Sequence, residues 1–507
     1  GLVSLEGALA LGAGGGGGER ARLLESGELR RRALPERLVA LERAEDPPVG
    51  RGQADGAPGR IAAMGRRVLL VHGRDAGRSA GLRAGLRAEG CAIAGFPVEA
   101  EPDMALIDAG VDAGRGVDVV VAMGGGAVID AGKAIAALIP ATRPMLDHLE
   151  VVGQGLPLDH PPLPFVAMPT TAGTGAEVTR NAVIGVPEHR RKVSLRDARM
   201  LPRLAIVDPG LTDGCPRGVT LASGLDAITQ VIEPYVGTRA NPLTDALCRD
   251  AIPRGLAAIR RLMEDEDAAA RDEMAWVSLC GGLALANAGL GAVHGLAGPL
   301  GGLTGAAHGA ICGTLLPHVL VANRRGVADP ARLEQVGQWI GAAFDAPDAG
   351  LEQAAGMLAR WSRAAGLPRL HDLGIDGAAQ RAAAEAAASS SSMKANPAAL
   401  SPAGAASGRT SAAPGAIPKR CINQSDSKAL TTRPPANAST LNSSASRMTI
   451  RREGPSGVLR PLEPADILWR WIELALFEFL AREVLLCHHT PEPAGRVPPI
   501  EGAGANV

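Results

Sequence analysis

The sequence predicts a parallel α/β domain followed by an all-helical domain, and two observations support this fold class. In the first part of the chain, short apolar runs rich in β-branched residues alternate with longer helical stretches. Such runs are typical of strands that are buried on both faces of a parallel sheet. From about residue 211 onward the strand signal disappears and helical patterns dominate. We therefore expect two domains of different classes.

The α/β elements can be assigned in chain order. The patterns predict strands at 66–73, 117–126, 163–170 and 204–209, and helices at 79–90 and 127–139. Parallel strands need crossover connections, and a helix is the usual one. We place the α/β domain at 49–210 and the all-helical domain at 211–405.

Both ends of the chain differ in composition from this globular region. Residues 1–48 combine a glycine run with a charged, helix-prone stretch that has no apolar stripe, which predicts a poorly ordered extension. Residues 406–507 are a low-complexity tail, rich in Ser, Pro, Asn and Thr over most of its length, and we expect this tail to be disordered or artefactual. We assign no function to either segment.

Charge and cysteine content exclude several classes of protein. The formal net charge of −1 gives the chain no general preference for nucleic acid or for an anionic membrane. The seven cysteines contain no CxxC pair, which favours free thiols and a cytoplasmic location. Residues 275–323 contain no Asp, Glu, Lys or Arg, so a membrane segment is an alternative there. The glycines, Pro299 and three histidines in this segment favour a buried helix pair with functional histidines.

Two glycine-rich loops follow predicted strands. Gly124, Gly125 and Gly126 stand between a strand and a helix, where free N–H groups and the helix dipole favour a phosphate. The second loop, 168–179, contains Thr170, Thr171 and Thr174 among glycines. The first loop alone favours phosphate binding over a merely tight turn, and the second fits a surface turn equally well. The first loop is not a GxGxxG fingerprint, and no such fingerprint follows the first predicted strand. Together they favour a nucleotide lying across the edge of the sheet.

The helical region offers side chains that suit a metal ion. Asp226 and Gln230 lie one helical turn apart, on the same face. His294 and His308 belong to the uncharged segment. One Asp and two His are a workable set of ligands for Zn²⁺ or Fe²⁺, whereas the neutral amide of Gln230 is a poor ligand. His318 fits a structural role equally well.

The ordered motifs resemble the iron-containing (group III) alcohol dehydrogenase family. They are "GGGAVIDAGK", "PTTAGTGAEVT", "IVDP", "GLDAITQVIE", "GLGAVHGLAGPLGG", "AAHGAICGTLLPHV" and "MKANPAAL". The resemblance implies a Rossmann-like, dinucleotide-binding N-terminal domain and an all-α C-terminal domain for metal and substrate, in a dehydroquinate synthase-like architecture. It also implies NAD or NADP in the cleft and a divalent metal, Fe²⁺ or Zn²⁺, beneath the nicotinamide.

The resemblance assigns roles to individual residues. Those that match the two cofactor loops are Gly124, Gly125, Gly126, Asp130, Thr170, Thr171 and Thr174. Asp226, His294 and His308 match three of the four metal ligands, through which they would act in catalysis. The fourth ligand, normally His, is Gln230 here, which implies a weakened metal site. Gly298 stands where the family usually has a further histidine for proton transfer, and Ala127 replaces the usual Ser after the glycines.

These assignments predict an NAD(P)-dependent, metal-assisted alcohol dehydrogenase, or aldehyde or ketone reductase, that acts by hydride transfer. We expect a small-molecule substrate, a homo-oligomer, and no nucleic-acid or membrane partner. Arg74 would suit NADP and Asp75 would suit NAD, so the choice of cofactor stays open. Two alternatives remain: a maleylacetate-type oxo-acid reductase with weak or no metal dependence, and a nucleotide-binding relative that has lost catalysis.

Overall fold

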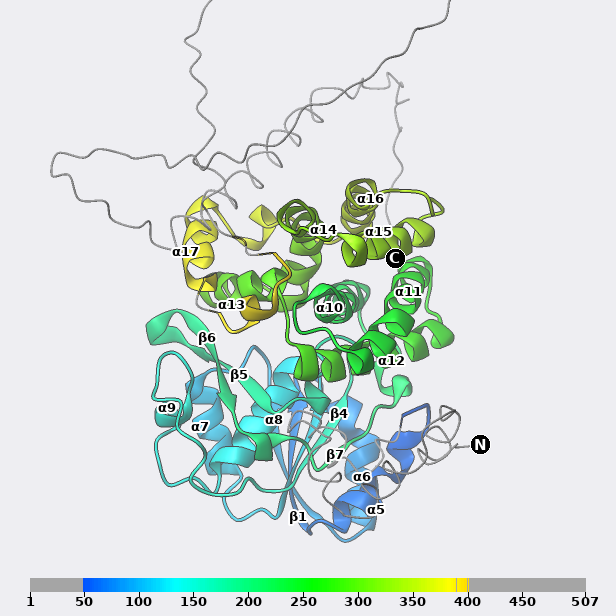
Figure 1. Cartoon of the computed structure of the whole chain (residues 1–507). Helices are drawn as coiled ribbons and strands as arrows, with labels where there is room; N and C mark the ends of the chain where they lie inside the picture. Colours follow the sequence, from blue (N-terminus) through cyan, green and yellow to red (C-terminus); the bar gives the residue numbers. More distant parts are fainter. Residues whose placement is uncertain (1–48, 389, 399, 401–507) are drawn as a thin grey trace, which may run out of the picture.

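The computed structural model of the protein describes residues 49–388, 390–398 and 400. The strands gather in one part of the molecule, and helices α10 to α17 form the other (Figure 1). The predictions for 1–48 and 406–507 concern segments outside the described residues.

The first part is built on a five-stranded parallel sheet with the strand order β2-β1-β3-β4-β7. Its strands are β1 (Arg67–Gly73), β2 (Ala92–Val98), β3 (Val119–Gly124), β4 (Phe165–Pro169) and β7 (Leu204–Ala205). Strand β2 lies on one side of β1, and β3, the next strand along the chain, lies on the other side of β1. In open α/β sheets, ligands bind outside the carboxyl ends of the strands at such a switch point.

Helices cover both faces of the sheet, because successive side chains of each apolar strand point to opposite sides. Leu69 and Val71 of β1 belong to a core shared with α7 and α8, whereas Val68 and Leu70 belong to a core shared with α5 and α6. These helices are α5 (Ala57–Ala62), α6 (Ala80–Ala88), α7 (Met104–Ala113) and α8 (Gly126–Leu138). The short helix α9 (Met145–His148) follows them.

Several elements differ from the predicted set. β2 and α7 are absent from it, and so is the antiparallel hairpin of β5 (Asn181–Val186) and β6 (Arg191–Arg196). β2 lies at the edge of the sheet, is mostly exposed and contains Pro97, so it lacks the apolar run of a central strand. β7 ends at Ala205 instead of 209, and beyond it Val207 forms an isolated parallel bridge with Val49.

The second part consists of packed helices. They are α10 (Arg217–Val236), α11 (Pro242–Glu264), α12 (Ala268–Ala288), α13 (Ala292–Thr304), α14 (His308–Gly326), α15 (Ala331–Ala343), α16 (Leu351–Ala364) and α17 (Gly377–Ala387). Helix α10 is buried along nearly its whole length and contacts α11, α12, α14 and α15. A helix surrounded in this way can hold polar side chains in fixed positions.

The uncharged segment lies within these helices. No single described helix is long and apolar enough to cross a membrane. Helices α12 and α13 satisfy the length and composition test only as a pair, and they are bent by 101° relative to each other.

Among the contacts between the two parts of the molecule are two close approaches of backbone to backbone. Strand β6 lies against α13 (Figure 1). A Cβ on Gly302 of α13 would lie 3.0 Å from the backbone N of Lys192 in β6. Helix α12 contacts the segment after β4, where a Cβ on Gly282 would lie 2.5 Å from the carbonyl O of Gly175. Glycines at these positions let the backbones approach closely.

A buried lysine on α8 holds the segment after β4 in place through hydrogen bonds. Lys133 of α8 is 1 % exposed, and its Nζ donates hydrogen bonds to the carbonyl oxygens of Ala176 (2.7 Å) and Asn181 (2.9 Å) and to Oγ1 of Thr179 (3.0 Å). Burial lowers the pKa of Lys133 to about 8. These bonds use all three donors of the ammonium group, which offsets part of the cost of burying it.

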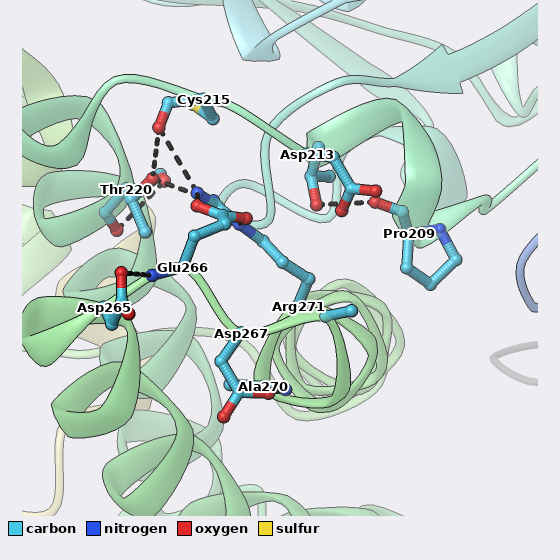
Figure 2. Close-up of polar contacts among 12 residues, drawn as sticks. Pro209, Asp213, Cys215, Thr220, Asp265, Glu266, Asp267, Ala270 and Arg271 are labelled. Carbon is cyan, nitrogen blue, oxygen red and sulfur yellow. Dashed lines mark hydrogen bonds and ion pairs between the residues drawn. The ribbon is translucent and has the colours of Figure 1, made fainter.

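A buried arginine fixes the start of α10 (Figure 2). The Arg271 guanidinium of α12 donates to both carboxylate oxygens of Glu266, at 2.8 and 2.7 Å. It also donates to Oγ1 of Thr220 (2.8 Å) and to the carbonyl O of Cys215 (3.3 Å). The ion pair with Glu266 raises the pKa of Arg271 further. Because Thr220 lies in the first turn of α10, this network sets where α10 begins relative to α12.

We expect Arg271→Lys to lower the free energy of unfolding by about 1–3 kcal/mol, because an ammonium group cannot hold Glu266 in a bidentate pair and also reach Thr220 and Cys215. Chemical denaturation measures this change. The matched control is Arg261→Lys, since the Arg261 side chain is about half exposed, against 6 % for Arg271, and its pair with Asp267 should contribute less than about 1 kcal/mol. Equal losses in the two variants would contradict the role given to Arg271.

Candidate metal centre and nucleotide loops

The two glycine-rich loops lie against each other at the carboxyl ends of β3 and β4. The N–H of Thr170 donates to the carbonyl O of Gly124 at 2.9 Å. A Cβ on Gly125 would lie 3.3 Å from Oγ1 of Thr171, and a Cβ on Gly126 would lie 2.5 Å from Cγ2 of Thr174. The threonine side chains therefore cover the backbone where α8 begins, a position that suits a phosphate.

Asp130 lies one turn further along α8, and its side chain is bonded to the β5–β6 hairpin rather than to the loops. Its Oδ2 accepts a hydrogen bond from the N–H of Val183 in β5 at 3.1 Å. Burial raises the pKa of Asp130 to about 6, although Lys133 acts in the opposite direction. The carboxylate thus supports the hairpin, and its assignment to the cofactor stays a prediction.

Three helices bring a second group of side chains together. Asp226 lies in the middle of α10, His294 in the first turn of α13, and His308 is the first residue of α14. Cys312 follows one turn later on α14. One ligand atom from each of these four residues lies within 4.8 Å of one such atom from every other. The rings of His294 and His308 are tilted, with their centroids 5.4 Å apart.

Glu233 orients His294. This carboxylate lies on α10, two turns after Asp226, and is 4 % exposed. Its Oε2 is 2.7 Å from Nδ1 of His294, and its Oε1 accepts the N–H of Val293 at 2.7 Å. A carboxylate only accepts, so Nδ1 carries the proton and the lone pair of the neutral imidazole is on Nε2. Carboxylates that hold a histidine in this way are common behind metal ligands.

The lone pair on His294 Nε2 faces a second acceptor. Nε2 lies 3.3 Å from Oδ1 of Asp226, and neither atom has a hydrogen-bond partner among the described residues. Two buried acceptors at this separation repel each other unless a positive charge lies between them. The residues present therefore fit a metal cation.

Burial and neighbouring charges shift the pKa values of the side chains in this cluster. Burial lowers the pKa of His294, but Cys312, Glu233 and Asp226 together raise it well above its usual value. Burial raises the pKa of Asp226, but His308 and His294 outweigh it and lower the pKa overall. Burial raises the pKa of the Cys312 thiol to about 12.

Gln230 is close to the cluster and acts as a donor. Its Nε2 donates to Oδ2 of Asp226 at 3.2 Å. Its Oε1 has no hydrogen-bond partner within the described part of the chain and lies next to α12, 3.4 Å from the position of a Cβ on Gly281. The amide thus holds Asp226 through its nitrogen, and whether Gln230 also binds a metal stays a prediction.

Sequence reasoning missed two residues of this site. Glu233 stands within "GLDAITQVIE", one turn after Gln230, and a buried glutamate on the same face as Asp226 was an available signal. Cys312 lies four residues after His308 in an apolar helix. A buried cysteine usually packs as a small apolar residue, so its position gave no separate signal.

Two other positions lie around the cluster without joining it. His318 lines an apolar cavity with Leu296 and Leu367, which agrees with the structural role left open for it. Gly298 is on α13, and a Cβ there would meet nothing within 4 Å. The position therefore has open space in which a side chain could stand.

Comparisons with known proteins agree with this geometry. The chain matches the family models "Iron-containing alcohol dehydrogenase" over residues 48–209 and "Fe-containing alcohol dehydrogenase family, C-terminal" over 220–404. It is 34 % identical to Alcohol dehydrogenase 4 of Schizosaccharomyces pombe over 281 residues, which are 55 % of this chain and 65 % of that protein. It is 39 % identical to 1,3-propanediol dehydrogenase of Klebsiella pneumoniae over 264 residues, which are 51 % and 66 % of the two chains. The matches therefore span slightly less than two thirds of these relatives.

The fold also matches solved structures. A crystal structure of 1,3-propanediol oxidoreductase superimposes with a TM-score of 0.61 and 31 % identity, covering 69 % of this chain and 94 % of that one. The predicted fold class, a Rossmann-like α/β region followed by a helical region, is thereby confirmed. The chain belongs to the iron-containing alcohol dehydrogenase family.

Proposed function

We propose that the chain is an NAD(P)-dependent alcohol dehydrogenase, or aldehyde or ketone reductase, that transfers a hydride between the nicotinamide and a small carbonyl or alcohol. The observation that carries the proposal is the pair of buried acceptors, Asp226 Oδ1 and His294 Nε2, which face each other and have no hydrogen-bond partner in the part of the chain that the structure describes. They stand in a chain whose relatives are named as dehydrogenases of alcohols and propanediol.

The proposed roles are divided between the two parts of the chain. Residues 49–210 bind the dinucleotide, with Gly124–Gly126 and the N-terminus of α8 at the pyrophosphate and Thr170, Thr171 and Thr174 beside it. Residues 211–405 hold the metal and the substrate. Support comes from the contact between the two loops and from the position of the loops at the switch point of the sheet.

Asp226, His294 and His308 would hold the metal. A divalent metal ion there would act as a Lewis acid that polarises a carbonyl and stabilises an alkoxide. Glu233 keeps Nε2 of His294 turned toward the site, and Gln230 restrains the carboxylate of Asp226. The His308 side chain is 31 % exposed, so the cluster is accessible from its side.

Proton transfer to the product differs from the usual arrangement of the family. Gly298 has no side chain that could carry a proton. Water or a ribose hydroxyl of the cofactor would serve instead.

The names of the relatives favour an alcohol dehydrogenase or aldehyde reductase over an oxo-acid reductase or a nucleotide-binding relative that has lost catalysis. The choice between NAD and NADP stays open, because Asp75 caps the turn after β1 and Arg74 contacts Glu99. A homo-oligomer and a cytoplasmic location stay predictions.

Asp226→Ala tests the function. We expect it to lower kcat/KM for aldehyde reduction with NADH or NADPH by about a hundredfold or more, because the metal loses its anionic oxygen ligand. The nucleotide Kd should change much less than kcat/KM, since Asp226 belongs to α10 and not to either of the two loops. Glu273→Gln on the exposed side of α12 is the control. Wild-type protein that turns over no aldehyde, ketone or alcohol with either cofactor would overturn the proposal.

We expect Gln230→His to raise the affinity for Zn²⁺ or Fe²⁺ by about tenfold, because it returns an imidazole to the face of α10 that carries Asp226. Gln230→Leu is the opposite variant: it removes the hydrogen bond to Asp226 and should weaken metal binding. Competition against a chelator gives both affinities. An unchanged affinity in both variants would mean that the side chain at 230 does not act on the site.

We expect Gly126→Ala to raise the KM for the nucleotide by about tenfold, because the new methyl would lie 2.5 Å from Cγ2 of Thr174 and push the two loops apart. Adding Thr174→Gly should restore part of the loss. Gly81→Ala on α6 is the matched control, since a Cβ there meets nothing within 4 Å. The metal content should not change, and a normal KM in Gly126→Ala would contradict the placement of the nucleotide.

A further inference from the structure

Cys312 stands where a fourth protein donor to the cluster is expected. Its Sγ lies 3.6 Å from Nε2 of His308, and its side chain is buried. It follows His308 by one turn of α14, so both side chains lie on the face of the helix that meets α10. Its thiol is thus directed into the site, in contrast to Cys280, which belongs to the core of α11 and α12.

The separations between donors agree with one shared ion. Bonds of about 2.0–2.1 Å to N or O and about 2.3 Å to S place tetrahedral donors roughly 3.3–3.6 Å apart. Asp226 Oδ1 and His294 Nε2 are 3.3 Å apart, and His308 Nε2 and Cys312 Sγ are 3.6 Å apart. The distance of 3.9 Å from His308 Nε2 to Asp226 Oδ1 is longer, and it belongs to the more exposed histidine.

A second, independent observation points to a ligand. Asp226 is 1 % exposed and His294 is 8 % exposed, and both direct an unpartnered atom into the space between the four residues. Gln230 does not fill that space, because its amide nitrogen is bound to Asp226 and its oxygen is next to α12.

We propose that the sulfur of Cys312 is the fourth protein donor to the divalent metal, together with Asp226, His294 and His308, and that Gln230 is a positioning residue for Asp226. This inference rests on the metal site of the proposed function, and it goes beyond it by naming a ligand that the family resemblance does not assign.

The chemistry of the site follows from this donor set. A metal–sulfur bond there would release the thiol proton to water. The metal would then have two anionic donors, Asp226 and the Cys312 thiolate, and two neutral imidazoles, which would neutralise a divalent ion, and a substrate oxygen would bind as a fifth ligand. With the usual ligands of the family, one Asp and three neutral His, a divalent metal site would instead keep a net charge of +1. A soft thiolate also shifts the preference toward Zn²⁺ relative to an all-nitrogen and oxygen site.

Cobalt substitution tests the donor directly. Chelator-treated full-length protein is titrated with Co²⁺, and a thiolate ligand produces an intense sulfur-to-cobalt charge-transfer band in the near ultraviolet. We expect this band in the wild type and in Cys280→Ala, the matched buried-cysteine control. In Cys312→Ala the band should vanish while Co²⁺ still binds, with affinity lower by about tenfold or more.

The other outcomes separate the two proposals. Co²⁺ binding without the band in the wild type, or a band that persists in Cys312→Ala, overturns the sulfur ligand and leaves the metal site standing. No Co²⁺ binding at all overturns both. If Cys312→Ala does not fold, X-ray absorption of the zinc-loaded wild type decides the matter: a sulfur neighbour at about 2.3 Å is expected, and only N and O neighbours at about 2.0–2.1 Å would overturn the inference.

Discussion

The site depends on the carboxylate of Glu233, which accepts two hydrogen bonds at the start of α13. One oxygen holds the N–H of Val293 and the other holds Nδ1 of His294, both at 2.7 Å. The first bond fixes the helix terminus and the second fixes the ring and its tautomer. Only this tautomer turns a lone pair toward Asp226 and makes the cluster require a cation. A Cβ on Gly291 would lie 2.9 Å from Oε1 of Glu233, which explains the glycine before α13.

A pair of asparagines supports the same terminus from the end of the described chain. Oδ1 of Asn396 accepts the N–H of Ala292 at 3.0 Å and Nδ2 of Asn323 at 3.2 Å. Nδ2 of Asn396 donates in return to Oδ1 of Asn323 at 2.7 Å. The late motif "MKANPAAL" therefore belongs with the histidine helices because it joins α13 to α14, although it contributes no atom to the cluster. A fully paired, buried amide network of this kind specifies one arrangement of the helices.

The features that were predictable from the sequence are those with a local pattern. The central strands, α6 and α8, and the two loops follow from apolar runs and glycines, whereas β2 could not be recognised because an exposed edge strand has no such run. Asp226, His294 and His308 came from motif order, and the structure brings them together. The pairing of Glu233 with His294 spans 61 residues, so it depends on how α10 and α13 pack and not on either segment alone. Cys312 could not be distinguished from a core residue until the direction of its thiol was known.

The two close approaches between the parts of the molecule have a mechanical consequence. A pair of bodies joined at one point can swing open, but β6 meets α13 at Gly302 while α12 meets the loop after β4 at Gly175. Two separate attachments remove most of that freedom. The relative position of the two parts is then largely set before a ligand arrives, so a ligand binds without a large closure of one part on the other. Less binding energy is spent on ordering the protein, and more is left to align the reactants.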